Sequence, residues 1–257
     1  VEADVVVVGA GGCGMTAALA AARRGAQVLL LEKARRPGGN TALSTGMVPA
    51  AGTRFQQEAG VDDSPEVMAQ DILTKNQGTS DSEMTFHLCQ QSASLVEWLA
   101  DEVGVELQLV TDFLYPGHTR NRMHVPPART GAELARQLWE AVNRQEGVRP
   151  VFEAPVGGLV VDDSAVVVGV TVKRAGVEYV RCRKVILATD GFGGNREMVA
   201  RYCPEILDGI YFGFEGNTGG CAELCRLQSV RRGWRHPSRG DHRGVGRDLA
   251  PRPGSAT

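Results

Sequence analysis

The sequence predicts an α/β protein whose core is a parallel β-sheet, and three observations support this prediction. First, Val5–Val8 is a run of β-branched residues, which suits a strand buried on both faces of a sheet. Second, a glycine-rich segment and an alanine-rich helical segment follow this run directly. Third, a second apolar run, residues 27–31, ends in an acidic residue. A strand–helix–strand unit therefore opens the chain.

The glycine-rich segment predicts a phosphate-binding turn. Gly9 can make the tight turn, Gly11 lets the backbone approach a pyrophosphate, and Gly14 allows the next helix to lie close to the strand. We expect that helix over residues 13–24, with its N-terminal amides directed at the phosphates and its end at Gly25. The candidate phosphate-binding residues are Gly9, Ala10, Gly11, Gly12, Cys13 and Gly14. This order of elements is typical of a Rossmann-like fold.

Glu32 follows the second strand, where its carboxylate can accept hydrogen bonds from both ribose hydroxyls of a dinucleotide and would repel a 2′-phosphate. This unit alone also suits NAD, so a NAD-dependent dehydrogenase remains an alternative. Residues 38–47 form a further loop of small and hydrogen-bonding residues. A NAD enzyme has no evident need for that loop, which favours FAD. A plain connector without a ligand is the other interpretation of the loop.

On these residues the chain resembles the flavoprotein family of fumarate reductase and succinate dehydrogenase, which also includes soluble flavocytochrome fumarate reductases and ketosteroid dehydrogenases. Residues 39–41, Ser44, Gly46 and residues 49–56 look most like the soluble fumarate reductase branch. The loop has no histidine that could attach the cofactor, so the resemblance implies non-covalent FAD. The FAD-binding residues that it implies here are Lys33, Gly39, Asn40 and Thr41 on the pyrophosphate side, and Ser44, Gly46 and Met47 along the isoalloxazine ring.

The next part of the chain is expected to be helical. Ser64 and Pro65 mark the start of one helix, and a second helix is predicted from Ser82 to about Val103, closed by Gly104. Its apolar residues follow helical spacing and predict its buried side. They are Met84, Leu88, Leu95, Val96 and Leu99. A short strand over residues 105–110 and an amphipathic helix from Thr130 to near Gly147 are expected next.

Strands dominate the following region. Residues 151–156 predict a parallel strand and its exit, where the resemblance implies that Val156 presents its backbone to adenine. Residues 159–161, 166–173 and 177–182 have the pattern of a β-meander. Residues 185–189 then predict a separate buried strand that returns to the parallel sheet.

The end of that last strand is the remaining FAD contact that the resemblance implies. Its residues are Ala188, Thr189, Asp190 and Gly191. The family pattern is Ala-Thr-Gly-Gly-Phe, so Asp190 stands where glycine is usual. A carboxylate beside an anionic cofactor should weaken binding unless the side chain turns away.

One loop is the candidate substrate site. Residues 115–127 contain His118, Arg122 and His124, a set that suits a dicarboxylate, and the resemblance places Arg122, His124 and Pro126 near flavin and substrate. A solvated basic loop is the alternative interpretation. The resemblance implies hydride transfer between flavin N5 and an unsaturated carboxylate, a small-molecule substrate; a ketosteroid dehydrogenase-like activity is a second possibility.

Composition is consistent with an enzyme that has neither a membrane nor a nucleic-acid partner. The net charge is −2, 42% of residues are hydrophobic, and no apolar run approaches the roughly 18 residues of a membrane span. Six cysteines form no CxxC pair, which predicts reduced thiols and a cytoplasmic location. No metal site is expected. Since haem-attachment and iron–sulfur motifs are absent from the sequence, a separate electron donor is expected.

The predicted organisation is an FAD-binding domain over residues 1–219, with a helical insertion at about 60–147, and an atypical tail over residues 220–257. The tail carries eight Arg, no Lys and three acidic residues, and it has no apolar periodicity. We expect it to be disordered or the product of a frameshift near Gly220, with the C-terminal part and the capping domain of the family missing. A natural basic tail that contacts nucleic acid is one alternative, and a truncated FAD-binding fragment without activity is another.

Overall fold

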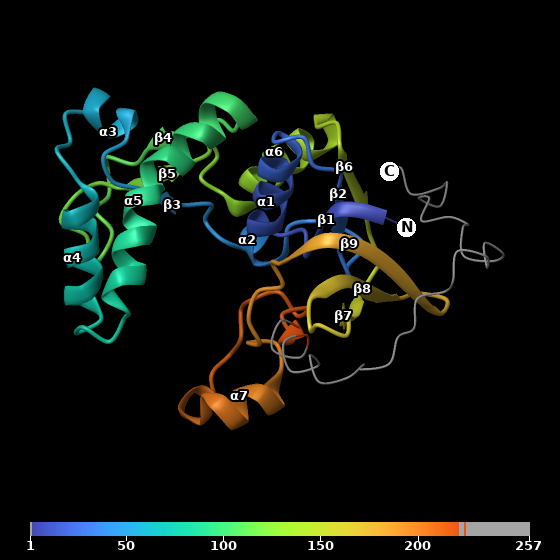
Figure 1. Cartoon of the computed structure of the whole chain (residues 1–257). Helices are drawn as coiled ribbons and strands as arrows, with labels where there is room; N and C mark the ends of the chain where they lie inside the picture. The colour runs from blue at the N-terminus through green and yellow to red at the C-terminus, as the bar shows by residue number, and fades with distance from the viewer. Residues whose placement is uncertain (1, 221–223, 225–257) are drawn as a thin grey trace. The chain divides into compact units, whose positions relative to one another are not determined.

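The computed structural model describes residues 2–220 and residue 224. The predictions made for the tail at residues 221–223 and 225–257 therefore lie outside the described part. The chain divides into two compact units (Figure 1). The first contains the residues up to Gly39 and those from Val142 onward, and the second is Asn40–Ala141. Each unit is described here by itself.

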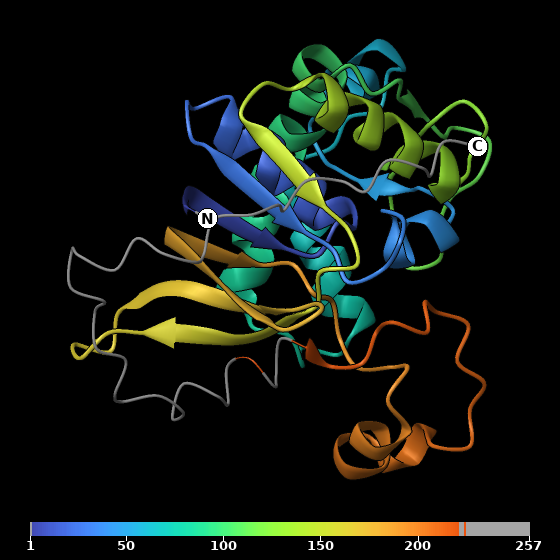
Figure 2. The same ribbon diagram turned by 90° about the vertical axis from the view of Figure 1, so that its right-hand side faces the viewer.

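The first unit is built on a six-stranded sheet with the order β6-β2-β1-β9-β8-β7. Its strands are β1 (Glu2–Val8), β2 (Val28–Leu31), β6 (Val148–Val151), β7 (Val156–Val161), β8 (Val167–Lys173) and β9 (Val177–Leu187). Strands β6, β2, β1 and β9 run parallel, and Val6 pairs with Leu29 on one side and Val185 on the other. Strands β7, β8 and β9 form the predicted antiparallel meander, visible in Figure 2. The α/β fold with a parallel sheet and a meander is confirmed.

Two strand predictions were wrong in their bounds. The parallel strand expected at residues 151–156 is β6, which ends at Val151, and Val156 instead begins β7. The two strands expected at 177–182 and 185–189 are one strand, β9. Its first part pairs with β8 and its last part with β1. The polar residues Arg183 and Lys184 interrupt the apolar run in the sequence, but both are exposed on a continuous strand.

Apolar side chains hold this sheet together. A cluster of buried residues from all six strands includes Val6, Leu29 and Val170. Helix α1 (Gly12–Ala22) packs on β1 and β2. Its buried residues Met15, Ala18, Leu19 and Ala22 have the i, i+3, i+4, i+7 spacing of one helix face. Helix α7 (Arg196–Tyr202) and a 3₁₀ turn (Pro204–Ile206) follow β9.

The second unit is mainly helical. Its helices are α3 (Arg54–Glu58), α4 (Pro65–Lys75), α5 (Ser82–Trp98) with a π-helical turn (Leu99–Val103), and most of α6 (Gly131–Arg144). Helices α4 and α5 pack side by side (Figure 1). As predicted, Ser64 caps α4 through its side chain, Pro65 is the first helical residue, and Gly104 ends the π-helical turn. A small antiparallel sheet has the order β3-β5-β4, with β3 (Val48–Pro49), β4 (Gln108–Leu109) and β5 (Met123–Val125).

Three local expectations in this region fail. Of the residues expected on the buried side of this helix, Val96 and Leu99 are buried, but Met84, Leu88 and Leu95 are exposed. The other buried residues of α5 are Thr85, Cys89 and Ser92. The strand expected over residues 105–110 is only the two-residue β4. The loop expected over residues 38–47 contains a short helix, α2 (Gly39–Leu43).

Candidate functional site

The turn after β1 has the geometry of a phosphate-binding turn. Gly9 has a φ of +102°, and a Cβ there would lie 2.4 Å from the carbonyl oxygen of Ala188. A Cβ on Gly14 would lie 1.8 Å from the carbonyl oxygen of Gly9. Both positions therefore require glycine. Helix α1 begins at Gly12 with no capping side chain and no acid in its first turn, so its positive N-terminal end can receive an anion.

Glu32 lies immediately after β2 and is fixed by two backbone amides. Its Oε2 accepts a hydrogen bond from the amide of Ala10 at 2.7 Å, and its Oε1 accepts one from the amide of Ala34 at 2.8 Å. The carboxylate is thereby tied to the glycine turn. A carboxylate oxygen can accept more than one hydrogen bond, so Glu32 retains capacity for two hydroxyl groups.

The end of β9 adjoins the same turn. The amide of Ala188 donates to the carbonyl of Val8 at 2.8 Å. Asp190 is exposed and has a φ of +62°, the left-handed conformation that glycine adopts freely. Its Oδ1 accepts a hydrogen bond from the amide of Gly191 at 2.8 Å. The side chain of Asp190 thus bonds to its own loop.

Sequence reasoning did not select Asn217, which lies opposite this loop. The amide of Gly194 donates to the carbonyl of Asn217 at 2.8 Å, and the amide of Gly219 donates to the carbonyl of Gly191 at 2.9 Å. Lys33 Nζ donates to Gly216 O and to Thr218 Oγ1. The two loops are therefore held together, and Lys33 ties the second loop to the end of β2. The only sequence signal was a family-like segment at residues 217–219.

These residues of the first unit fit a dinucleotide. Gly9 and Gly14 allow the close backbone packing of a phosphate-binding turn, and Glu32 offers a fixed acceptor for hydroxyls. Thr189 Oγ1 and Asn217 Oδ1 are buried and have no hydrogen-bond partner among the described residues. Buried polar atoms in native proteins are nearly always paired, so these two atoms are consistent with a bound polar group. Val156 lies two residues after Ala154. The amide of Ala154 donates a hydrogen bond to the carbonyl of Glu32 at 2.9 Å.

The predicted flavin residues of the second unit lie near the start of α6. Asn40 and Thr41 are in α2, directly after Gly39. Ser44 Oγ donates to the carbonyl of Thr41 at 2.8 Å and accepts from the amide of Gly46 at 3.0 Å. The Gly131 amide donates to Ser44 O at 2.8 Å, and a Cβ on Gly131 would lie 2.0 Å from Thr41 O. Close backbone contact fixes this segment, and Met47 packs on a small apolar cluster of Val110, Met123 and Val125.

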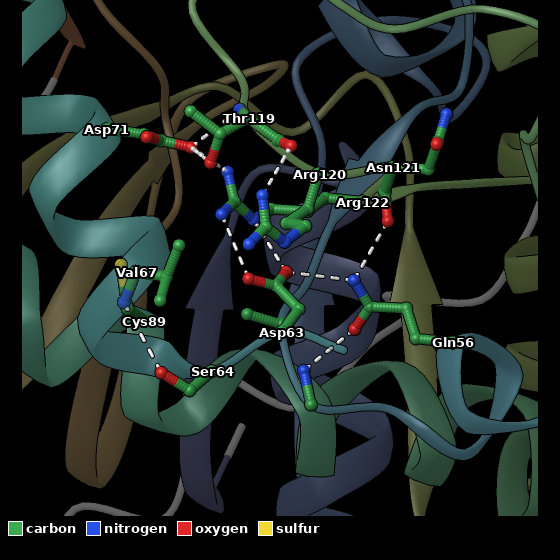
Figure 3. Close-up of polar contacts among 12 residues, drawn as sticks. Gln56, Asp63, Ser64, Val67, Asp71, Cys89, Thr119, Arg120, Asn121 and Arg122 are labelled. Carbon is green, nitrogen blue, oxygen red and sulfur yellow. Dashed lines mark hydrogen bonds and ion pairs between the residues drawn. The ribbon is translucent and has the colours of Figure 1, made fainter. Parts of the chain in front are cut away.

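Arg122 lies in a buried ionic network (Figure 3). Its guanidinium donates to both oxygens of Asp63, at 2.7 and 2.9 Å, and to Asp71 Oδ2 at 2.6 Å. The side chains of Arg122 and Asp63 are 1% and 0% exposed. Thr119 also donates to Asp71, and Gln56 Nε2 donates to Asp63 at 2.9 Å. Arg122 thus has carboxylate partners within its own unit, and the basic segment is not a fully solvated loop.

Of the two predicted histidines, His124 is also held internally, whereas the buried Nδ1 of His118 has no hydrogen-bond partner among the described residues. His124 is fully buried; its Nε2 is 2.9 Å from Thr53 Oγ1 and its Nδ1 is 3.3 Å from Val48 O. Since a carbonyl only accepts, Nδ1 carries the proton and Nε2 accepts from Thr53. Burial lowers the pKa of His124. Burial, reinforced by the nearby Arg122 charge, also lowers the pKa of His118. The assignment of these residues to a substrate stays a prediction.

The described residues contain no cluster of His, Cys, Asp and Glu that could hold a metal ion. Within the same described part, none of the helices has the length and apolarity that crossing a bilayer requires.

Comparison with known proteins gives concordant results. The family model described as FAD binding domain matches residues 4–232. The chain is 35% identical over 224 residues to a urocanate reductase of Eggerthella lenta, covering 86% of this chain and 37% of that protein. It is 36% identical over 210 residues to a probable fumarate reductase of Shewanella frigidimarina, covering 80% and 35% respectively. The chain therefore spans little more than a third of the length of these relatives.

Two solved structures resemble the chain closely. An open conformation of a flavocytochrome c3 fumarate reductase has a TM-score of 0.82 at 33% identity, covering 88% of this chain and 40% of that one. A 3-ketosteroid-Δ4-(5α)-dehydrogenase of Rhodococcus jostii has a TM-score of 0.78 at 31% identity, covering 88% and 54%.

Proposed function

Because the chain belongs to the FAD binding domain family, with FAD as its cofactor, we propose that it is the FAD-binding part of an oxidoreductase that acts on a small unsaturated carboxylate. The observation that carries the proposal is the turn after β1, where Gly9 and Gly14 leave no room for a side chain and Glu32 is tied to the same turn through Ala10. Urocanate and fumarate, named by two relatives, both carry a carboxylate conjugated to a carbon–carbon double bond. This shared chemistry supports the substrate class.

Each residue of the first unit has a defined task in this proposal. The amides at the start of α1 would bind the pyrophosphate, and Glu32 would bind ribose hydroxyls. Bound FAD supplies the hydride chemistry. In the second unit, residues 40–47 would line the cofactor. The buried neutral His124 would hold the Thr53 side chain and the Val48 backbone in place through its two ring nitrogens.

A ketosteroid substrate is the second candidate, and the likeness to the Rhodococcus jostii dehydrogenase favours it. A separate electron donor and a cytoplasmic location belong to the same proposal and rest on sequence composition. Asp63 and Asp71 balance the charge of Arg122. We therefore do not assign the binding of a substrate carboxylate to Arg122 alone.

The test uses the purified chain. We expect it to retain the visible absorption of flavin after incubation with FAD and gel filtration. The bound flavin is then reduced chemically under anaerobic conditions and mixed with fumarate, urocanate or a 4-ene-3-keto steroid. Reoxidation by an unsaturated carboxylate supports the proposed function, and reoxidation by the steroid alone supports the second candidate. Flavin that binds but is reoxidised by none of them indicates a binding fragment without activity.

A further inference from the structure

Helix α5 presents a row of large apolar side chains to solvent. Met84, Leu88 and Leu95 are 58%, 62% and 41% exposed, and the exposed Gln91 lies between the last two. Successive members are four, three and four positions apart, so all four share one side of the helix along about 16 Å of its axis. We call these four residues the α5 stripe. A contiguous exposed apolar patch is typical of an interaction site.

The buried side of α5 already has its partners within the second unit. Helix α4 packs against it (Figure 1). Ser92 Oγ accepts a hydrogen bond from the amide of Ala51 at 3.1 Å, and Glu97 Oε1 accepts one from the amide of Arg54 at 2.8 Å. The buried residues of α5 are Thr85, Cys89, Ser92 and Val96. These mostly small and polar side chains fix the helix, so the larger side chains of the stripe are not needed for this packing.

The charge around the stripe is acidic. Residues 76–119 contain seven acidic residues and no Lys or Arg. Asp81 and Glu83 are exposed at the start of α5, and Asp101 and Glu102 are exposed just beyond its end. Arg54 forms an ion pair with Asp101 and so balances one of these charges. Negative charge therefore brackets the apolar stripe at both ends.

This charge pattern selects the kind of partner. A second copy of α5 would bring acids against acids in either orientation, because both ends of the helix are acidic. An anionic lipid surface would be repelled for the same reason. A helix with apolar residues on one face and Lys or Arg at its ends would instead meet apolar surface and opposite charge together.

We propose that the α5 stripe docks a basic amphipathic helix of a partner protein. The apolar face of that helix would cover Met84, Leu88 and Leu95, and its basic residues would lie near the acids at the two ends of α5. One row of side chains is smaller than the roughly 800 Å² per partner of a standard interface, so we expect a transient contact of micromolar affinity or weaker. The inference does not depend on the proposed FAD site.

Synthetic peptides of about the length of α5 test the proposal on the purified chain. One peptide has Leu at helical spacing on one face and Lys elsewhere, and its matched counterpart has Glu in place of every Lys. Fluorescence anisotropy of the labelled peptides measures binding. We expect the Lys peptide to bind and the Glu peptide not to bind. Leu88→Gln should weaken binding of the Lys peptide about tenfold, because the burial of a leucine side chain is lost.

Further variants separate this site from non-specific binding. Ile210→Gln changes a residue that is 80% exposed but belongs to the first unit, so it should bind the Lys peptide as the wild-type chain does. Glu83→Gln should weaken binding at low salt but not at about 0.5 M salt, where exposed charges are screened. Because Leu88 and Ile210 are exposed, both Gln variants should unfold at the wild-type temperature.

Four outcomes would overturn the inference. The first is that the Lys peptide does not bind, and the second is that the Glu peptide binds equally well. The third is equal affinity of the wild-type and Leu88→Gln chains for the Lys peptide. The fourth is a wild-type chain that is dimeric in analytical ultracentrifugation and a Leu88→Gln chain that is monomeric, which would assign the stripe to a second copy of the chain.

Discussion

Asp190 shows how one residue affects both folding and cofactor binding. Its φ of +62° is favourable for glycine but costs other residues about 1–2 kcal/mol, and aspartate less because its side chain can bond locally. The hydrogen bond from the Gly191 amide to Asp190 Oδ1 is such a local bond. The resembling family has glycine here, which agrees with the backbone conformation.

We predict that Asp190→Gly strengthens FAD binding several-fold and raises the unfolding temperature slightly. The substitution relieves the backbone and removes a carboxylate from the loop that approaches an anionic cofactor. Ala165→Gly is the matched control, since Ala165 has a φ of +60° in a hairpin turn. It should raise the unfolding temperature without changing FAD affinity. Equal FAD affinity of the Asp190→Gly and wild-type chains would contradict the electrostatic part of this prediction.

The residue patterns of the sequence were sufficient for the glycine turn but not for the basic loop. The turn residues and Glu32 lie close together along the chain, and their spacing alone predicted a phosphate-binding turn. Arg122, by contrast, is neutralised by acids that lie 59 and 51 positions away. No local pattern reveals such partners. The sequence pattern of Arg and His predicted a substrate site, which stays a prediction, but it gave no sign of the internal ion cluster at Arg122.

At the scale of elements, this ion cluster joins separate segments of the second unit. Asp63 precedes α4, Asp71 lies within α4, and Arg122 immediately precedes β5. Thr119 Oγ1 adds a bond to Asp71 at 2.8 Å. The network therefore fixes the segment before β5 onto α4.

We predict that Arg122→Met destabilises the chain by about 3–5 kcal/mol, because the buried Asp63 and the partly buried Asp71 lose their counter-charge. The measurement is the free energy of unfolding in urea. Arg136→Met is the control: its ion pair with Glu140 is exposed on α6, and its loss should cost less than about 0.5 kcal/mol. The triple variant Arg122→Met, Asp63→Asn, Asp71→Asn should recover part of the loss. A loss for Arg122→Met as small as for Arg136→Met would refute the structural role of the network.

Two elements show where sequence patterns mislead. Met84, Leu88 and Leu95 have helical spacing on α5, yet they are 58%, 62% and 41% exposed. Periodicity shows that a helix has an apolar stripe but not that a neighbour covers it. Two strands were predicted at 177–182 and 185–189, whereas β9 is one strand that pairs first with β8 and then with β1. Pairing between strands that are distant in the sequence cannot be predicted from either segment alone.

At the scale of the whole molecule, the two units differ in the chemistry of their cores. The first has an apolar cluster to which all six strands of its sheet contribute. Most of the buried polar residues among the described ones belong to the second: Thr53, Gln56, Thr85, Ser92, Arg122, His124 and Gln137. Within the described residues, histidines occur only in the second unit. The stability of the two units should therefore respond differently to mild acid.

We predict that the second unit loses stability as the pH falls from about 7 to 5.5, while the first does not. Burial lowers the pKa values of His118 and His124 in the folded chain, and the unfolded chain retains values of about 6.5. Below that pH the unfolded chain binds more protons than the folded one, so stability falls with decreasing pH. Asp71 does not contribute in this window. Burial alone would raise its pKa, but bonds from Arg122 and Thr119 outweigh that effect and lower it.

Hydrogen exchange read by mass spectrometry, corrected for the intrinsic effect of pH, measures the two units separately. Peptides from α4 and α5 should lose protection at the lower pH, and peptides from β1 and β2 should keep it. His118→Gln should reduce the loss, because one group that binds a proton on unfolding is removed. His87→Gln should leave it unchanged, since His87 is exposed on α5. Equal loss of protection in both units would show that the neutral buried histidines do not set the acid response of the chain.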